Sequence, residues 1–267
     1  MNKIFNVLFT GMLALGIMTA NAESQIFKKK KKKNNISTEQ TDSVKKDSAA
    51  NYKKLLKGAK TTEGMFKIHQ VKDKYYFEIP KKLMTRDFMI SSRVSSTSNN
   101  KDVAAGQMPR NPVVVTFSAD NKKVYMHRKM LRNLCDTTSN MYKAFQRNYS
   151  DPIWEAYKIE SISPDSSAYV IDMTPLFITD VPEFSPFRSG NIMDVLMKRK
   201  PLSGSLSSAK SAILGIKCFP LNINIKSLMS YTVNGGPFTV TMTRNIILLP
   251  EKTMRPRYSD SRIGYFD

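Results

Sequence analysis

This chain has few of the side chains that build metal centres. Its 267 residues include only two histidines, His69 and His127, two cysteines, Cys135 and Cys218, and one tryptophan. A catalytic zinc ion needs three protein ligands, and the protease motif places two histidines one helical turn apart around a glutamate. Neither histidine has such a partner, so we interpret both as exposed strand residues. A composite metal site of these histidines and cysteines is the alternative.

The two cysteines lie 83 positions apart. A disulfide between them would close a long loop and contribute about 4–5 kcal/mol in the chain-entropy model. The sequence does not decide whether they pair. We favour two buried free thiols, and the disulfide is the alternative.

Motifs for phosphate binding and serine catalysis are also missing. Neither Gly-x-Gly-x-x-Gly nor Gly-x-x-x-x-Gly-Lys occurs in the sequence. A Ser-x-x-Lys spacing is present at 207–210 and 43–46, but the companion Ser-Asp-Asn and Lys-Thr-Gly elements are absent. We interpret both matches as chance in a chain rich in serine and lysine.

Three carboxylates cluster around the stretch from Pro175 to Pro186, namely Asp172, Asp180 and Glu183. Capping or turn formation is the expected role of such residues. We therefore predict no catalytic, cofactor-binding or metal-ligating residue and no cofactor in this chain.

Acidic residues are scarce, with 22 Asp and Glu against 42 Lys and Arg and a net charge of +20. Residues 23–62 alone contribute +8, and they contain an unbroken lysine block: Lys28, Lys29, Lys30, Lys31, Lys32 and Lys33. Such runs repel themselves and stay solvated, so we predict a disordered linker at 23–48. The alternative is an arm that holds anionic polymers. Because no aromatic residue interrupts the block, we expect no specific nucleic-acid partner.

The apolar run near the N-terminus is short. Lys3 precedes the run from Ile4 to Met18, and Ala20-Asn21-Ala22 supplies small residues at the expected cleavage position. This pattern predicts a signal peptide over residues 1–22, cleaved after Ala22, with export to the periplasm or beyond. No transmembrane span is expected after cleavage. A buried N-terminal helix is the alternative interpretation.

Hydrophobic periodicity predicts a small α+β domain over residues 49–104. A helix begins near Ala49, carries an apolar stripe through 52, 55, 56 and 59, and ends at Gly58 and a turn over 61–64. A hairpin follows over 65–68 and 75–79, and a third strand covers 88–94.

The rest of the chain, residues 105–267, reads as a larger β-rich domain. The expected strands cover 113–117, 123–129, 155–162, 168–173, 221–228, 231–233 and 238–249, with Asn234-Gly235-Gly236-Pro237 as the last turn. Helices are expected at 133–146 and 191–198. The fold class is therefore β-rich α+β, with a mainly antiparallel sheet.

Several ordered segments resemble the N-terminal domains of exported bacterial zinc-dependent metalloproteases of the met-zincin group. The first domain is similar at Gly64-Met65-Phe66-Lys67-Ile68-His69, Lys74-Tyr75-Tyr76-Phe77-Glu78-Ile79-Pro80 and Arg86-Asp87-Phe88-Met89-Ile90. The second is similar at Ala105-Gly106-Gln107, Pro112-Val113-Val114-Val115-Thr116-Phe117, Val124-Tyr125-Met126, Ile159-Glu160-Ser161-Ile162-Ser163-Pro164-Asp165-Ser166 and Val170-Ile171-Asp172-Met173-Thr174-Pro175-Leu176-Phe177. Leu249-Pro250-Glu251, Met254-Arg255-Pro256-Arg257 and Asp260-Ser261-Arg262-Ile263-Gly264-Tyr265-Phe266 resemble the junction to the catalytic domain. The likeness covers roughly residues 50–267.

The resemblance implies a non-catalytic accessory or pro-region, because the family's His-Glu-x-x-His zinc helix lies beyond this junction and is missing here. Zinc is implied only for that catalytic domain, which would be the partner. An independent exported module that binds anionic envelope polymers through its lysine block is the alternative. Peptide hydrolysis by this chain itself would need an activated water or nucleophile, for which we find no residues.

Overall fold

The computed structural model describes residues 49–131, 135–198, 200–252, 254 and 262. Every described residue belongs to one compact unit. The predicted signal peptide at 1–22 and linker at 23–48 lie outside the described residues.

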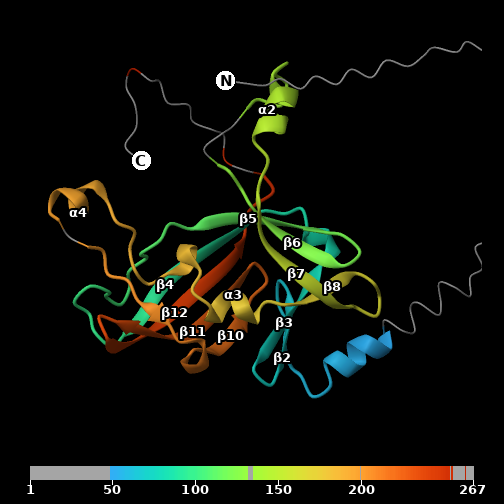
Figure 1. Cartoon of the computed structure of the whole chain (residues 1–267). Coiled ribbons are helices and arrows are strands. Elements are labelled where there is room, and N and C mark those ends of the chain that lie inside the picture. Colours follow the sequence, from blue (N-terminus) through green and yellow to red (C-terminus); the bar gives the residue numbers. More distant parts are fainter. Residues whose placement is uncertain (1–48, 132–134, 199, 253, 255–261, 263–267) are drawn as a thin grey trace, which may run out of the picture. The chain divides into compact units, whose positions relative to one another are not determined.

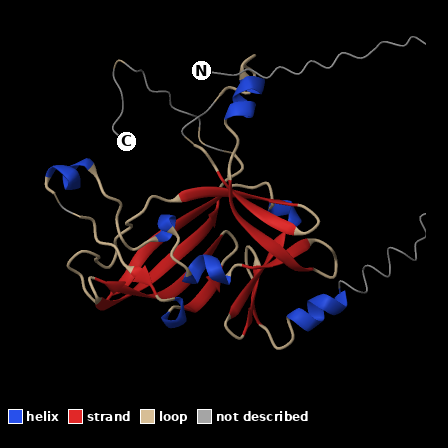
Figure 2. Ribbon diagram, in the orientation of Figure 1, coloured by secondary structure: helices blue, strands red, loops and turns tan. Residues whose placement is uncertain are grey.

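One antiparallel sheet contains the strands of the described part (Figures 1 and 2). Its order is β1-β2-β3-β8-β7-β6-β5-β4-β12-β11-β10, and β9 pairs separately with β11. The strands are β1 (Lys60–Thr62), β2 (Lys67–Val71), β3 (Lys74–Pro80), β4 (Phe88–Thr97), β5 (Val113–Ala119), β6 (Lys123–Arg128), β7 (Ile153–Ile162), β8 (Ala168–Asp172), β9 (Ser205–Leu206), β10 (Ala212–Cys218), β11 (Asn222–Val233) and β12 (Gly236–Leu248). The predicted β-rich α+β class with antiparallel strands is confirmed.

Helices within the described residues are short. They are a helical segment at 49–55, α2 (Tyr142–Asn148), α3 (Thr174–Ile178) and α4 (Ile192–Leu196), with 3₁₀ turns η1 (Lys81–Leu83), η2 (Pro182–Phe184) and η3 (Ser208–Lys210). Helix α3 contacts β10, β11 and β3 and covers this part of the sheet (Figure 1). None of the helices that the structure describes has the length and apolar character required to cross a bilayer.

The strands of the two predicted domains alternate within this sheet. β3 pairs with β8, and β4 lies between β5 and β12. The expected boundary after residue 104 falls in the connection between β4 and β5, which are hydrogen-bonded neighbours. The division into 49–104 and 105–267 stays a prediction, but the two parts share one sheet.

Several local predictions were wrong. Residues 60–62 form β1 where a turn was expected, and helix α2 covers only the end of the predicted helix at 133–146. The strands expected at 221–228 and 231–233 are one strand, β11, while β10 and α3 were not predicted. The last hairpin turns over two residues, Asn234 and Gly235, with φ of 50° and 80°. Asn-Gly readily adopts these positive φ values in a two-residue hairpin.

The interior contains two apolar clusters separated by a polar row. Phe88 and Ile90 of β4 belong to the first cluster, whereas Val94 belongs to the second. Between them, on neighbouring strands, lie the buried side chains of Ser92, Ser227 and Arg244. The guanidinium of Arg244 is 1% exposed, and burial lowers its pKa to about 10. It donates from Nη1 to the Phe177 carbonyl (3.0 Å) and lies 5.7 Å from the Phe184 ring.

The two ends of the sheet meet beside Gly64. The Met65 amide donates to the Phe219 carbonyl (2.8 Å), and β1 lies in contact with β10. A Cβ atom at Gly64 would lie 2.7 Å from Cβ of Cys218 and 2.8 Å from the Phe219 oxygen. Real Cβ atoms do not approach backbone this closely, so this contact requires glycine.

We expect the substitution Gly64→Ala to lower the free energy of unfolding by about 1–3 kcal/mol, because the added methyl group forces β10 and the 64–65 segment apart. Urea denaturation measures this change. Gly215→Ala is the matched control, since a Cβ there meets no atom within 4 Å. Equal stability of the two variants would contradict the view that the contact between the two ends of the sheet requires glycine at position 64.

Candidate functional site

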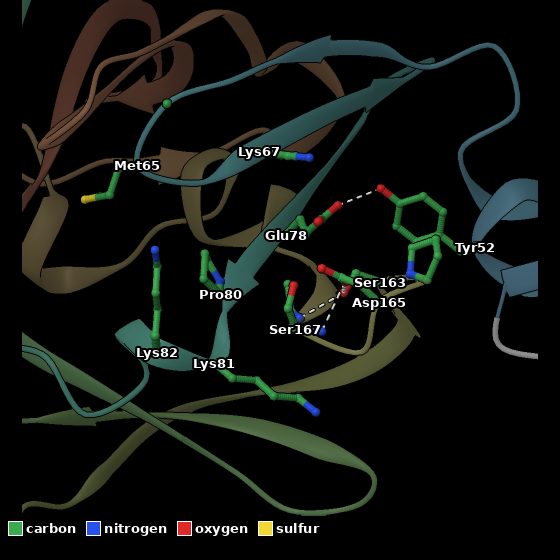
Figure 3. A pocket seen from close by; sticks show the side chains of 13 residues that line it. Tyr52, Met65, Lys67, Glu78, Pro80, Lys81, Lys82, Ser163, Asp165 and Ser167 are labelled. Carbon is green, nitrogen blue, oxygen red and sulfur yellow. Dashed lines mark hydrogen bonds between the residues drawn. The ribbon is translucent and has the colours of Figure 1, made fainter. Parts of the chain in front are cut away.

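A cavity of about 760 Å³ lies where the helical segment at 49–55, the β2–β3 hairpin and the turn after β7 come together. It is lined by Tyr52, Gly64, Met65, Lys67, Glu78, Pro80, Lys81, Lys82, Ser163, Pro164, Asp165, Ser167 and Ala168. Figure 3 shows Tyr52 and Glu78 pointing toward each other across one wall of this cavity. Its walls therefore combine ammonium, carboxylate and hydroxyl groups.

A hydrogen-bonded network of four side chains supports that wall. Thr61 Oγ1 lies 2.8 Å from His69 Nδ1, and His69 Nε2 lies 3.0 Å from Glu78 Oε2. The Tyr52 hydroxyl donates to the same Glu78 oxygen (2.6 Å). The network crosses three adjacent strands and then reaches the helical segment, so it joins that segment to the sheet.

His69 was expected to be an exposed strand residue, and this prediction was wrong. Its exposed fraction is only 4%, and that of Glu78 is 6%. The outer face of the hairpin is covered, because the Tyr52 ring packs edge-on against the His69 ring with centroids 6.2 Å apart. His127 on β6 is partly exposed, and its Nε2 atom lies 2.7 Å from the Ser118 hydroxyl.

The network changes the acidity of Glu78 and Tyr52. Burial raises the pKa of Glu78, but hydrogen bonds from His69 and Tyr52 outweigh this effect and hold the pKa below its usual value. Burial, aided by the Glu78 carboxylate, raises the pKa of Tyr52. Glu78 is therefore ionised and Tyr52 is protonated at neutral pH.

Another part of the lining is a tight turn organised by Asp165. Its carboxylate accepts hydrogen bonds from the Ser163 hydroxyl (2.6 Å) and the Ser167 amide (3.1 Å), which lower its pKa to about 2. Lys81 also lines the cavity, and its Nζ atom lies 4.8 Å from the centre of the Tyr169 ring. Of the four-residue network, Tyr52 and Glu78 line the cavity, whereas Thr61 and His69 lie behind its wall.

The three carboxylates in and beside the 175–186 stretch are separated in the structure. Asp172 accepts from the Thr174 amide (3.0 Å), as expected for a turn-forming residue, and pairs with Lys74 (3.2 Å). Glu183 pairs with Arg128 (2.7 Å). The Tyr231 hydroxyl donates to Asp180 (3.4 Å). Each carboxylate has its own partner.

The remaining motif residues are also apart from the cavity. Lys210 ends the 3₁₀ turn η3 and Ser207 is the residue before that turn, whereas the second Ser-x-x-Lys match, at 43–46, lies outside the described residues. Cys135 and Cys218 are free thiols, as favoured, but both are partly exposed and not fully buried as predicted. Partial burial raises the pKa of Cys218 to about 11. Within the described residues, no group of three or more His, Cys, Asp or Glu side chains is placed to hold a metal ion.

Two protein-family models match most of the described chain. A family model described as "Domain of unknown function (DUF5117)" matches residues 106–267, which is more than half of the sequence. The chain belongs to the DUF5117 family. A second model, "Domain of unknown function (DUF5118)", matches residues 49–97 of this DUF5117 chain. Comparison with curated proteins and with solved structures gave no match.

Sequence reasoning missed the network because its members are distant in sequence. One signal was available, since a two-residue turn at Lys72 and Asp73 places His69 and Glu78 on adjacent strands within diagonal reach. The contact of Tyr52 with this pair depends on how the 49–55 segment packs, which no local pattern specifies.

We expect Glu78→Gln to lower the free energy of unfolding at pH 7 by about 1–3 kcal/mol, since it weakens the hydrogen bonds from His69 and Tyr52. The folded-state pKa of Glu78 is depressed, so its contribution is present above the unfolded pKa of about 4.3 and is lost as pH falls through the folded value. Urea denaturation between pH 3 and 7 should show the variant and the wild type converging at low pH. Glu63→Gln, at an exposed glutamate, is the control. A pH-independent difference would contradict this account.

Proposed function

We propose that this chain is the non-catalytic N-terminal portion, an accessory or pro-region, of an exported zinc-dependent metalloprotease. In this proposal it folds as one sheet, docks on the catalytic domain and orients or masks it. The zinc ion and the His-Glu-x-x-His helix belong to that catalytic domain. The support comes from the ordered sequence resemblance and from one contact in the structure.

The contact is an ion pair between two of the resembling segments. Arg86 Nη1 lies 2.6 Å from Glu251 Oε1, and Arg86 Nη2 donates to the Leu249 carbonyl (2.9 Å). The Leu249 amide in turn donates to the Asp87 carbonyl (2.9 Å). Residues 249–251, the first of the segments that resemble the junction, are thus held at the start of β4. An anchor at this point would give an attached catalytic domain a defined starting position relative to the sheet.

Association in solution tests the proposal. The purified chain, mixed at micromolar concentration with the separately expressed catalytic domain of the same precursor, should form a one-to-one complex in sedimentation velocity. The absence of a complex at these concentrations would contradict an accessory role.

The contribution of the Arg86–Glu251 ion pair is tested in a chain that continues into the catalytic domain. There, Arg86→Gln should lower the melting temperature of the catalytic domain. Arg93→Gln, at an exposed arginine on β4, should leave it unchanged.

A second candidate function is that of an exported binding module for anionic envelope polymers. The observation that favours it is the lysine block at 28–33, which carries six positive charges without an intervening acid. Electrostatic binding of this kind is sensitive to salt and insensitive to polymer sequence.

Replacing the six lysines at 28–33 with glutamine should then abolish retention on an anionic polysaccharide column at low salt. The matched control replaces six exposed lysines of the folded unit: Lys53, Lys54, Lys57, Lys101, Lys217 and Lys226. Unchanged retention after loss of the 28–33 block, or an equal loss in the control, would reject this function.

A further inference from the structure

A short arm leaves the sheet between β6 and β7. We name this segment, residues 129–131 and 135–152, the α2 arm. Figure 1 shows α2 standing away from the strands, and none of its residues is buried. Large apolar side chains are exposed along the arm, including Met141 at 71%, Leu131 at 57% and Tyr149 at 52%. This exposure is costly in water unless another surface covers it.

Helix α2 is amphipathic. The rings of Tyr142 and Phe145 stack with centroids 6.5 Å apart, and those of Phe145 and Tyr149 lie 5.0 Å apart. Helical spacing places Lys143 and Arg147 on the opposite side, and both are exposed. An aromatic face opposite a cationic face is typical of helices that lie in a membrane interface.

The charge of the arm indicates the partner. No acidic residue occurs between positions 137 and 150. The acids at its two ends are engaged within the arm, since Asp136 accepts from Thr138 (2.8 Å) and Asp151 accepts from the Met130 amide (2.9 Å). Helix α2 therefore has a cationic side opposite its aromatic face. This combination complements a surface that is anionic and has an apolar interior.

A groove on the arm has a mixed lining and a volume of about 460 Å³. Its apolar part is formed by Met130, Leu131, Tyr142, Phe145 and Tyr149, and polar groups come from residues such as Lys129, Gln146 and Asp151. The root of the arm is fixed to the sheet, because Lys129 Nζ lies 2.9 Å from Asp87 Oδ2. The arm is thus anchored at its base and exposes apolar side chains away from the sheet.

We propose that the α2 arm binds the surface of an anionic lipid bilayer. The rings and methionines enter the headgroup region, and Lys143 and Arg147 contact lipid phosphates. This inference stands independently of the proposed metalloprotease role, because it rests on the arm alone.

Flotation with vesicles tests the inference on the full chain. Vesicles contain 30% phosphatidylglycerol in phosphatidylcholine, or phosphatidylcholine alone. The wild type should bind the anionic vesicles, and the double substitution Met141→Glu with Tyr149→Glu should weaken the partition coefficient by about tenfold or more. Lys143→Gln with Arg147→Gln should also weaken it by about tenfold. Glycerol phosphate in solution should not compete at the same phosphate concentration.

The control is Leu214→Glu with Leu221→Glu, which makes the same charge change at exposed apolar positions on and beside β10. This variant should bind within about twofold of the wild type. Lys53→Gln with Lys57→Gln is the control for the cationic pair. Matching urea curves establish that all variants are folded.

Three results would overturn the proposal: unchanged binding in both arm variants, an equal loss in the arm variants and their controls, or wild-type binding that glycerol phosphate abolishes. Absence of vesicle binding by the wild type would equally overturn the lipid assignment. If Met141→Glu with Tyr149→Glu then disrupted a complex with the catalytic domain, the arm would be a protein-docking surface.

Discussion

The close approach of backbone at Gly64 is the constraint on which the sheet depends. The glycine lets the segment before β2 reach Cys218 and Phe219, and the Met65 amide completes the contact by donating to the Phe219 carbonyl. β1 and β10 are the two ends of the strand order. The contact at Gly64 therefore brings the ends of the sheet together, and residues far apart in sequence enclose one interior. The first apolar cluster accordingly takes members from β2 and β3 as well as from β11 and β12. Without this contact, the partly buried apolar side chains of β10, such as Ile213 and Ile216, would be more exposed to water.

The same hairpin that reaches β10 on one side carries the buried network on the other. Burial of a histidine and a glutamate is favourable only when their polar atoms are paired. Here both ring nitrogens of His69 and the Oε2 atom of Glu78 have partners on other elements. The carboxylate of Glu78 joins β3 to the helical segment through Tyr52. The cavity wall is therefore stiff where Tyr52 and Glu78 line it, whereas its lysines are held more loosely, since Lys67 makes only a long contact of 3.8 Å with Glu63.

The sequence predicts the features that depend on local pattern. Alternation and turn residues placed β3, β5, β6, β7 and β8 to within a few residues, because each has its own apolar period and its own turn. The pattern of β10 was missed, since Gly215 and a bulge interrupt its alternation. The prediction for His69 failed for a different reason. Burial of a strand's second face is decided by what packs on it, and the 49–55 segment that does so is fixed by tertiary contacts alone.

The polar row inside the sheet contains residues from both of the segments that the two family models match. The DUF5118 match includes β4, which carries Ser92, and the DUF5117 match includes β11 and β12, which carry Ser227 and Arg244. Arg244 lies directly opposite Ser92 in the β4–β12 register. A slip of one residue would turn the guanidinium to the other face and place its neighbours among the apolar side chains. A buried cation with few partners adds little stability, yet it penalises wrong registers between strands that come from distant parts of the chain. The polar row thus joins strands from the two matched segments, and it lies between the two apolar clusters.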